Sequence, residues 1–133
     1  MPITPTRRWL CHGILAATVL AALPAAAQHA HDHKPKHGGI VREANDFVYE
    51  LKATPTAITV WVTDEANKPV ATTGSSAKLA LIDSGQRTEV ALAPAGDNRL
   101  AANGSFVLRP GMGALLEVSV GGKTVAKLRY TLK

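Results

Sequence analysis

The sequence predicts an all-β protein: an antiparallel β-sandwich, immunoglobulin-like, with seven to eight short strands. Three observations predict this fold class. From residue 40 onward, apolar and polar residues alternate in short runs, turn residues separate the runs at regular spacing, and no window shows helical periodicity. Many short strands at this spacing are typical of two packed antiparallel sheets. A small open barrel is the alternative arrangement of the same strands.

The individual strands follow from strict period-two alternation. In the stretch 58–63, Ile58, Val60 and Val62 share one face while the threonines face the other way. The stretch 124–132 has the clearest alternation, with apolar residues at every even position from 126. The other predicted strands lie at 47–52, 78–82, 88–92, 99–102 and 115–120.

Turn residues separate these strands. Glycine, proline, asparagine and aspartate cluster between the alternating runs, and the Gly121–Gly122 pair predicts a hairpin between the last two strands. A domain of this size buries about two-thirds of its unfolded surface. We therefore expect the alternating apolar residues to be committed to the core. The aromatic residues are expected to pack rather than to form a ligand platform: Phe47, Tyr49, Trp61, Phe106 and Tyr130.

Residues 1–27 have the three parts of a secretory signal. Arg7 and Arg8 supply the positive charge, an apolar run covers 13–23, and three alanines precede the expected cleavage after Ala27. The apolar run is shorter than the roughly 20 residues that a membrane-spanning helix needs. We expect export to the periplasm by the ordinary secretory route, with the twin-arginine route as the alternative.

Cleavage would leave a chain of one domain that contains no cysteine. The only cysteine, Cys11, leaves with the signal, so neither a disulfide nor a thiolate ligand is expected. The net charge falls by two from +5, because Arg7 and Arg8 are removed. The remaining charges are scattered and form no basic run, which argues against a nucleic-acid partner. The mature chain is expected to be a monomer.

Residues 28–39 hold four of the five histidines of the chain: His29, His31, His33 and His37. Imidazole is the commonest side-chain ligand for borderline divalent metals, and such a histidine-rich run is typical of metal binding. We expect this segment to be flexible and to curl around one ion, which costs conformational entropy. Modest affinity and fast exchange should follow. The competing interpretation is a solvated polar tail.

The available donor atoms narrow the choice of metal ion. After cleavage there is no cysteine, and Met112 is the only methionine, so a soft Cu(I) site has little support. Nitrogen ligands favour Cu(II) or Zn(II), with Co(II) and Ni(II) as further options. Asp32 could add a carboxylate oxygen or orient an imidazole.

A family resemblance extends this reading. The histidine segment, which ends in Pro-Lys-His-Gly-Gly, is followed by the motifs FVYEL at 47–51, VWVTD at 60–64, KPV at 68–70 and PAGD at 94–97. This order resembles a group of small periplasmic proteins found with heavy-metal efflux systems. It is also similar to the His-Gly-Gly-led β domain at the N-terminus of some periplasmic adaptor subunits of metal pumps. The resemblance implies a metal-handling accessory for copper, zinc or cobalt.

The sequence thus predicts a periplasmic metal-binding protein of three parts: a signal (1–27), a histidine segment (28–39) and a β-sandwich (40–133). It would serve as a metal buffer or donor in heavy-metal resistance or efflux. The alternative is a protein-interaction module that docks on an efflux adaptor or pump, with the histidines incidental. We expect no enzyme, because the histidines all lie outside the predicted strands and no nucleophile–base constellation is evident.

Overall fold

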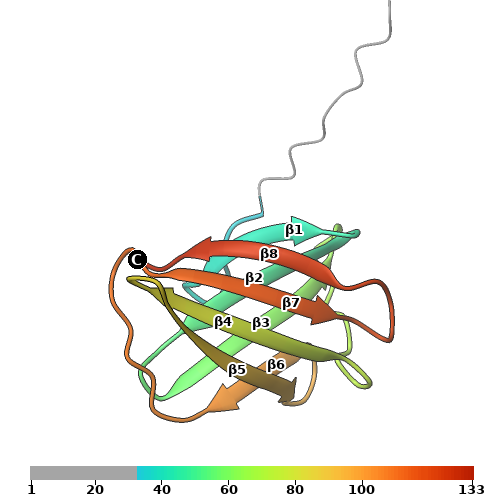
Figure 1. The fold of residues 1–133 in the computed structure, drawn as a ribbon. Helices are drawn as coiled ribbons and strands as arrows, with labels where there is room; N and C mark the ends of the chain where they lie inside the picture. The colour runs from blue at the N-terminus through green and yellow to red at the C-terminus, as the bar shows by residue number, and fades with distance from the viewer. Residues whose placement is uncertain (1–32) are drawn as a thin grey trace, which may run out of the picture.

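The computed structural model describes residues 33–133, and over this range it contains eight strands and no helix (Figure 1). The strands all pair antiparallel, so the all-β fold predicted from the sequence is confirmed. Within these residues, no helix that could span a membrane is present. The strands are β1 (Ile40–Ala44), β2 (Phe47–Ala53), β3 (Ala57–Asp64), β4 (Ser76–Asp83), β5 (Gln86–Pro94), β6 (Arg99–Asn103), β7 (Gly113–Ser119) and β8 (Ala126–Thr131).

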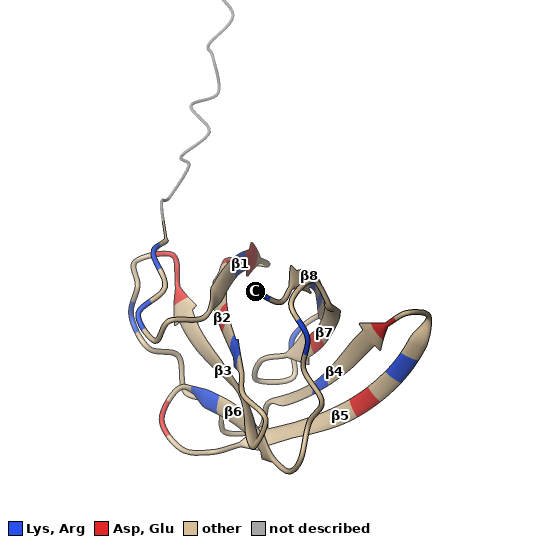
Figure 2. Ribbon diagram, turned by 90° about the vertical axis from the view of Figure 1, so that its left-hand side faces the viewer, with Lys and Arg blue, Asp and Glu red and all other residues tan. Residues whose placement is uncertain are grey.

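The eight strands form one sheet in the order β1-β2-β3-β6-β5-β4-β7-β8. Two residue pairs, Ala93 with Ala101 and Pro94 with Leu100, join its two halves through β5 and β6. The sheet curls until its first and last strands lie side by side, which gives a nearly closed barrel (Figure 2). The two halves still face each other across one core, so the arrangement combines the predicted sandwich with the open barrel that was the alternative.

Side chains bridge the seam between β1 and β8, where the backbone ladder is absent. The Arg42 Nε donates a hydrogen bond to the Arg129 carbonyl over 3.1 Å. The Asn45 side-chain amide lies 3.5 Å from the Thr124 carbonyl. The two contacts show that β1 and β8 run antiparallel along the seam, because the later residue of the first strand's side contacts the earlier residue of the second.

The core follows the predicted alternation. Ile58, Val60 and Val62 of β3 are fully buried, and every second residue of β8 from Ala126 points inward. The Tyr130 hydroxyl crosses the core and donates to the Tyr49 carbonyl over 3.2 Å. This bond satisfies the hydroxyl, which an apolar interior would otherwise penalise.

Strand β1 was not among the strands predicted from the sequence. Its five residues contain no strict alternation, and two of them are charged. The turn after it carries a clearer signal, because Asn45 and Asp46 both adopt positive φ, at 52° and 65°. Two such residues form the type I′ turn that matches the twist of a hairpin, and β1 pairs with β2 directly across it.

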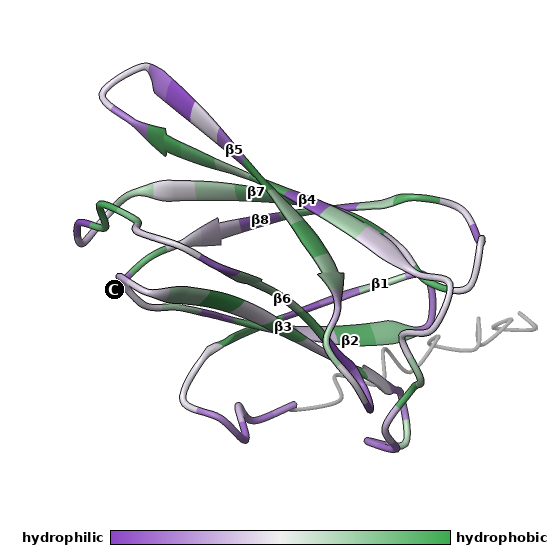
Figure 3. Cartoon of the chain, turned by 90° about the horizontal axis from the view of Figure 1, so that it is seen from below, coloured by the Kyte–Doolittle hydropathy of each residue, from purple (hydrophilic) through white to green (hydrophobic). Residues whose placement is uncertain are grey.

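Strand β2 departs from simple alternation in a way that leads to the functional site. Tyr49 and Leu51 point into the core as predicted, but the outward-facing Val48 and Glu50 are buried too. Something must therefore cover the outer face of β2. In Figure 3 the hydrophilic segment before β1 passes outside the layer of β2 and β3.

Candidate functional site

The covering element is the segment 33–39, which we call the docked segment. It runs over the outer face of the sheet, where Val41, Val48, Glu50 and Trp61 share one side of β1, β2 and β3 through the pairs 41–50, 48–63 and 50–61. A small crevice there is lined by His33, His37 and residues of all three strands. We expected the whole histidine segment to be flexible. That expectation is corrected for residues 33–39, because these residues make specific contacts with the strands.

Glu50 is the centre of these contacts. Its side chain accepts hydrogen bonds from three backbone N–H groups of the docked segment, those of Lys36 (3.0 Å), His37 (2.7 Å) and Gly39 (3.0 Å). The His37 Nδ1 lies 2.8 Å from the second carboxylate oxygen, Oε2. Burial alone would raise the pKa of Glu50, but the His37 and backbone hydrogen bonds outweigh it and hold the pKa below its usual value. Glu50 is therefore an anion that pins the docked segment.

His37 is fixed on both its edge and its face. Its ring stacks on the Trp61 indole with centroids 3.9 Å apart and planes 2° from parallel. Because Nδ1 faces an ionised carboxylate, Nδ1 carries a proton, and in the neutral ring the lone pair is then on Nε2. The side chain is 40% exposed. Many metal-binding histidines donate their other ring N–H to a carboxylate in this way. Such a hydrogen bond fixes the tautomer and the ring orientation, and it makes the coordinating nitrogen a better ligand.

The two glycines after His37 are required by this geometry. Gly38 has a φ of 75°, a conformation that costs other residues energy. A Cβ on Gly39 would lie 2.5 Å from the Leu51 carbonyl oxygen and 2.9 Å from the Glu50 Cγ. The His-Gly-Gly motif is thus a docking motif: one residue stacks, the next turns the chain, and the third allows close approach to β2.

His33 is held differently. Its Nδ1 lies 3.1 Å from the Asn67 side-chain oxygen and its Nε2 lies 3.3 Å from a Glu43 carboxylate oxygen. The side chain is only 3% exposed. Both ring nitrogens face acceptor oxygens, so His33 would have to leave these contacts before it could coordinate a metal.

The structure describes two of the four histidines that the sequence predicts as metal ligands. His33 and His37 lie on the same outer face, whereas His29, His31 and the predicted signal lie outside the described residues. Among residues 33–133, no three histidine, cysteine, aspartate or glutamate side chains are grouped so that they could hold a metal ion. A site of several ligands would need donors from the segment that precedes residue 33.

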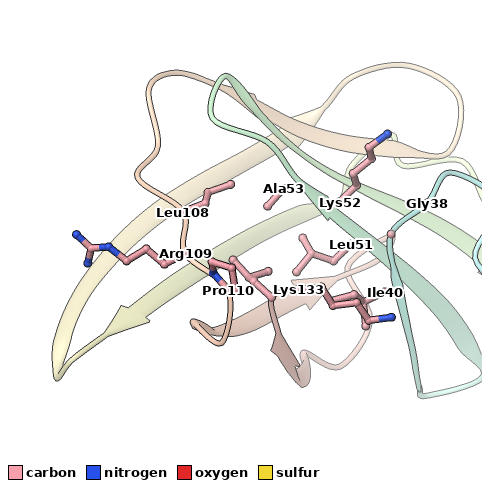
Figure 4. A pocket seen from close by; sticks show the side chains of 11 residues that line it. Gly38, Ile40, Leu51, Lys52, Ala53, Leu108, Arg109, Pro110 and Lys133 are labelled. Carbon is pink, nitrogen blue, oxygen red and sulfur yellow. The ribbon is translucent and has the colours of Figure 1, made fainter.

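A larger cavity lies beside the docked segment at one end of the barrel (Figure 4). It measures about 250 Å³, and Gly38, Ile40 and Leu51 are among the residues that line it. The charged ends of Lys52 and Arg109 point away from it. Because no histidine, cysteine or acidic side chain is among its lining residues, it offers no donor set for a transition metal.

The strand residues that complete the site were not predicted from the sequence. Glu50 and Glu43 appear in the sequence as ordinary outward-facing charges, and Asn67 as a turn residue. Trp61 was expected to pack, and it does, but on His37 at the outer face rather than in the core. One signal was available: Glu50 and Trp61 belong to neighbouring predicted strands, and a glutamate opposite a tryptophan on an outer face suggests a covered surface.

A scan against protein-family models, a search of curated proteins and a search of solved structures each found no match to this chain. Inference about function therefore starts from the geometry around His37 and from the composition of the histidine segment.

Proposed function

We propose that this protein binds a divalent transition metal, Cu(II) or Zn(II), and serves as a periplasmic metal buffer or donor in heavy-metal resistance or efflux. The observation that supports the proposal is the Glu50–His37–Trp61 arrangement, in which Nδ1 faces Glu50 and the lone pair on Nε2 would be the one offered to a metal. The sequence adds His29 and His31 on the same segment. Imidazole nitrogens without thiolates suit both metals.

In this proposal the ligands have unequal roles. His37 is the fixed ligand, because its orientation is set before metal arrives and little conformational entropy is lost there. His29 and His31 would supply further imidazole nitrogens from the same segment. His33 joins only if the metal competes successfully with Glu43 and Asn67 for its ring nitrogens. Glu50 orients His37 and does not itself contact the metal.

The test is competitive titration of Zn(II) and Cu(II) against a calibrated chelator. His37→Phe keeps a ring on Trp61 but removes the nitrogen, and it should weaken binding at least about ten-fold, or 1.4 kcal/mol. The double variant His29→Ala/His31→Ala should lose at least as much. The control, Glu65→Ala, removes an exposed carboxylate outside the docked segment and should bind as the wild type does. Wild-type affinity in His37→Phe would refute the proposed ligand.

A second candidate function is a protein-interaction module that docks on an efflux adaptor or pump. One observation favours it: both described histidines have contacts with the strands that need no metal. The two candidates separate in cells challenged with metal. The His29→Ala/His31→Ala protein should fail to restore tolerance if it acts by binding metal, and should restore it fully if it acts by docking.

A further inference from the structure

Strand β5 has a long unpaired edge. It pairs with β4 along residues 86–92, but on its other side only Ala93 and Pro94 pair with β6. The β4–β5 hairpin projects from the body of the barrel, with β5 on its outer side (Figures 2 and 3). Among the described residues, no further strand lies beside residues 86–92.

The hairpin geometry shows which backbone groups face outward. Ser84 and Gly85 form a two-residue turn with φ of 49° and 81°, and Asp83 pairs with Gln86 across it. Hydrogen-bonded and non-hydrogen-bonded pairs alternate from such a turn. Gln86 and Thr88 therefore bond to β4, whereas Arg87, Glu89 and Ala91 direct their N–H and C=O groups away from it. No backbone hydrogen bond from the other described residues reaches these groups.

The side chains on this edge carry opposite charges at alternate positions. Arg87 and Glu89 lie on the same face, where the Arg87 Nη2 is 3.1 Å from the Glu89 Oε1. Both side chains are about half exposed. Lys78 of β4 lies 3.7 Å from Glu89 and adds a second positive charge nearby.

We propose that β5 pairs antiparallel with β5 of a second copy of this chain, around a two-fold axis at Thr88. A two-fold interface is self-complementary by symmetry. In this register Arg87 lies opposite Glu89 of the second copy, and the reciprocal pair forms on the other side of the axis. These positions are also the ones whose backbone groups face outward, so each pair can exchange two hydrogen bonds.

The charges select this register over its neighbours. An axis at residue 87 would place arginine opposite arginine, and an axis at residue 89 would place glutamate opposite glutamate. Like charges directly opposite on neighbouring strands are destabilising. Charged residues on an edge strand commonly discourage pairing, but a pair of opposite signs two residues apart attracts a second antiparallel copy of itself.

The dimer should be weak. Pairing two short edges buries less surface than the roughly 1,600 Å² of a standard stable interface. A monomer–dimer equilibrium that depends on concentration and ionic strength should result, in place of the monomer expected from the sequence.

Sedimentation equilibrium of the purified protein tests the pairing. Arg87→Glu makes the edge all negative and Glu89→Arg makes it all positive, so each variant alone should dimerise at least about ten-fold more weakly than the wild type, since both cross-strand pairs become repulsive. An equal mixture of the two variants should form a heterodimer. The double swap, Arg87→Glu/Glu89→Arg, should restore self-association because opposite charges again face each other.

Two controls show whether a variant that fails to dimerise is still folded. Each variant should keep the wild-type circular dichroism spectrum, and successful heterodimerisation itself requires two folded partners. A wild-type protein that stays monomeric at millimolar concentration overturns the proposal. A dimer that all variants form equally well overturns it too, because a different surface would then be responsible.

Discussion

His37 and His33 are four residues apart on the docked segment, and a strand carboxylate holds each of them. Glu50 holds His37 through Nδ1, and Trp61 supports the ring from its face, so one edge of the imidazole stays accessible. Glu43 and Asn67 face both nitrogens of His33, and that side chain is almost completely buried. Two histidines on the same surface thus differ: the His37 side chain is 40% exposed, whereas the His33 side chain is 3% exposed.

The two carboxylates differ as much as the two histidines. The Glu50 side chain is 8% exposed and accepts hydrogen bonds from three backbone amides as well as from His37. The Glu43 side chain is 48% exposed and has a single longer contact with His33. A buried, multiply bonded anion contributes much more than a half-exposed carboxylate with one contact. The His37 end of the segment should therefore carry most of the docking energy.

The largest expected effect comes from removing the Glu50 side chain. Glu50→Ala leaves the amides of Lys36, His37 and Gly39 without their acceptor and should lower the free energy of unfolding by about 3 kcal/mol. The matched change Glu43→Ala should cost less than about 1 kcal/mol, because the Glu43 carboxylate is half exposed to solvent. Urea denaturation of both variants measures the difference. Equal losses would show that the two ends are held equally.

The next largest effect should come from Gly39. In Gly39→Ala the new methyl group would meet the Leu51 carbonyl, so β2 and the docked segment must separate, at a cost of about 2 kcal/mol. Gly38→Ala is the control: its Cβ meets nothing within 4 Å, and only the left-handed backbone costs energy, about 1 kcal/mol. Amide hydrogen exchange at residues 36–39 should speed up more in the first variant. The reverse order would show that close approach is not what requires glycine.

Metal affinity should also respond to Glu50, although Glu50 is not a ligand. Glu50→Gln keeps the shape of the side chain and removes its charge, and changes to such orienting groups cost about 10–100-fold in metal affinity. Glu43→Gln should leave the affinity within about two-fold, less than 0.5 kcal/mol. The chelator titration described above measures both. Unchanged affinity in Glu50→Gln would mean that the Glu50–His37 bond serves docking alone.

The smallest effect is the response to acid. Because the folded state lowers the pKa of Glu50, the unfolded state binds more protons in the window below the ordinary glutamate value, and stability falls as pH drops through it. The contribution is fully present above about pH 5 and is lost below it, by at most about 1.4 kcal/mol per pH unit. Glu50→Gln should remove this part of the pH dependence. Thermal unfolding from pH 6 to 3 would reveal it, and identical slopes in both proteins would contradict it.

Alternation and turn residues were sufficient to predict most of the fold. Strands such as β3 and β8 bury only one face, so every second residue is buried and the alternation is visible in the sequence. They did not predict β1, whose Arg42 and Glu43 interrupt the apolar pattern. They also did not distinguish two packed sheets from one curled sheet. That choice depends on the two residue pairs that join β5 to β6, which the alternation of apolar and polar residues does not reveal.

The histidines were identifiable from the sequence, but their partners were not. Glu50 and Glu43 alternate correctly with the core residues of their strands, so nothing marks them as covered by another part of the chain. Gly39 lies within a recognisable His-Gly-Gly motif, but the approach to the Leu51 carbonyl that requires it depends on tertiary structure. The sequence alone suggests histidines as metal ligands, whereas the structure shows which contacts hold His33 and His37.

The central claim is that Glu50 presents the Nε2 of His37 to a metal ion. Long-range proton–nitrogen NMR correlation of the histidine rings tests it directly, recorded at about pH 8, where imidazoles are ordinarily neutral, before and after addition of diamagnetic Zn(II). We expect His37 to carry its proton on Nδ1 without metal. Zinc should shift the Nε2 resonance while the Nδ1 proton remains. A proton on Nε2 in the metal-free protein, or a His37 ring that zinc leaves unchanged, would contradict the claim.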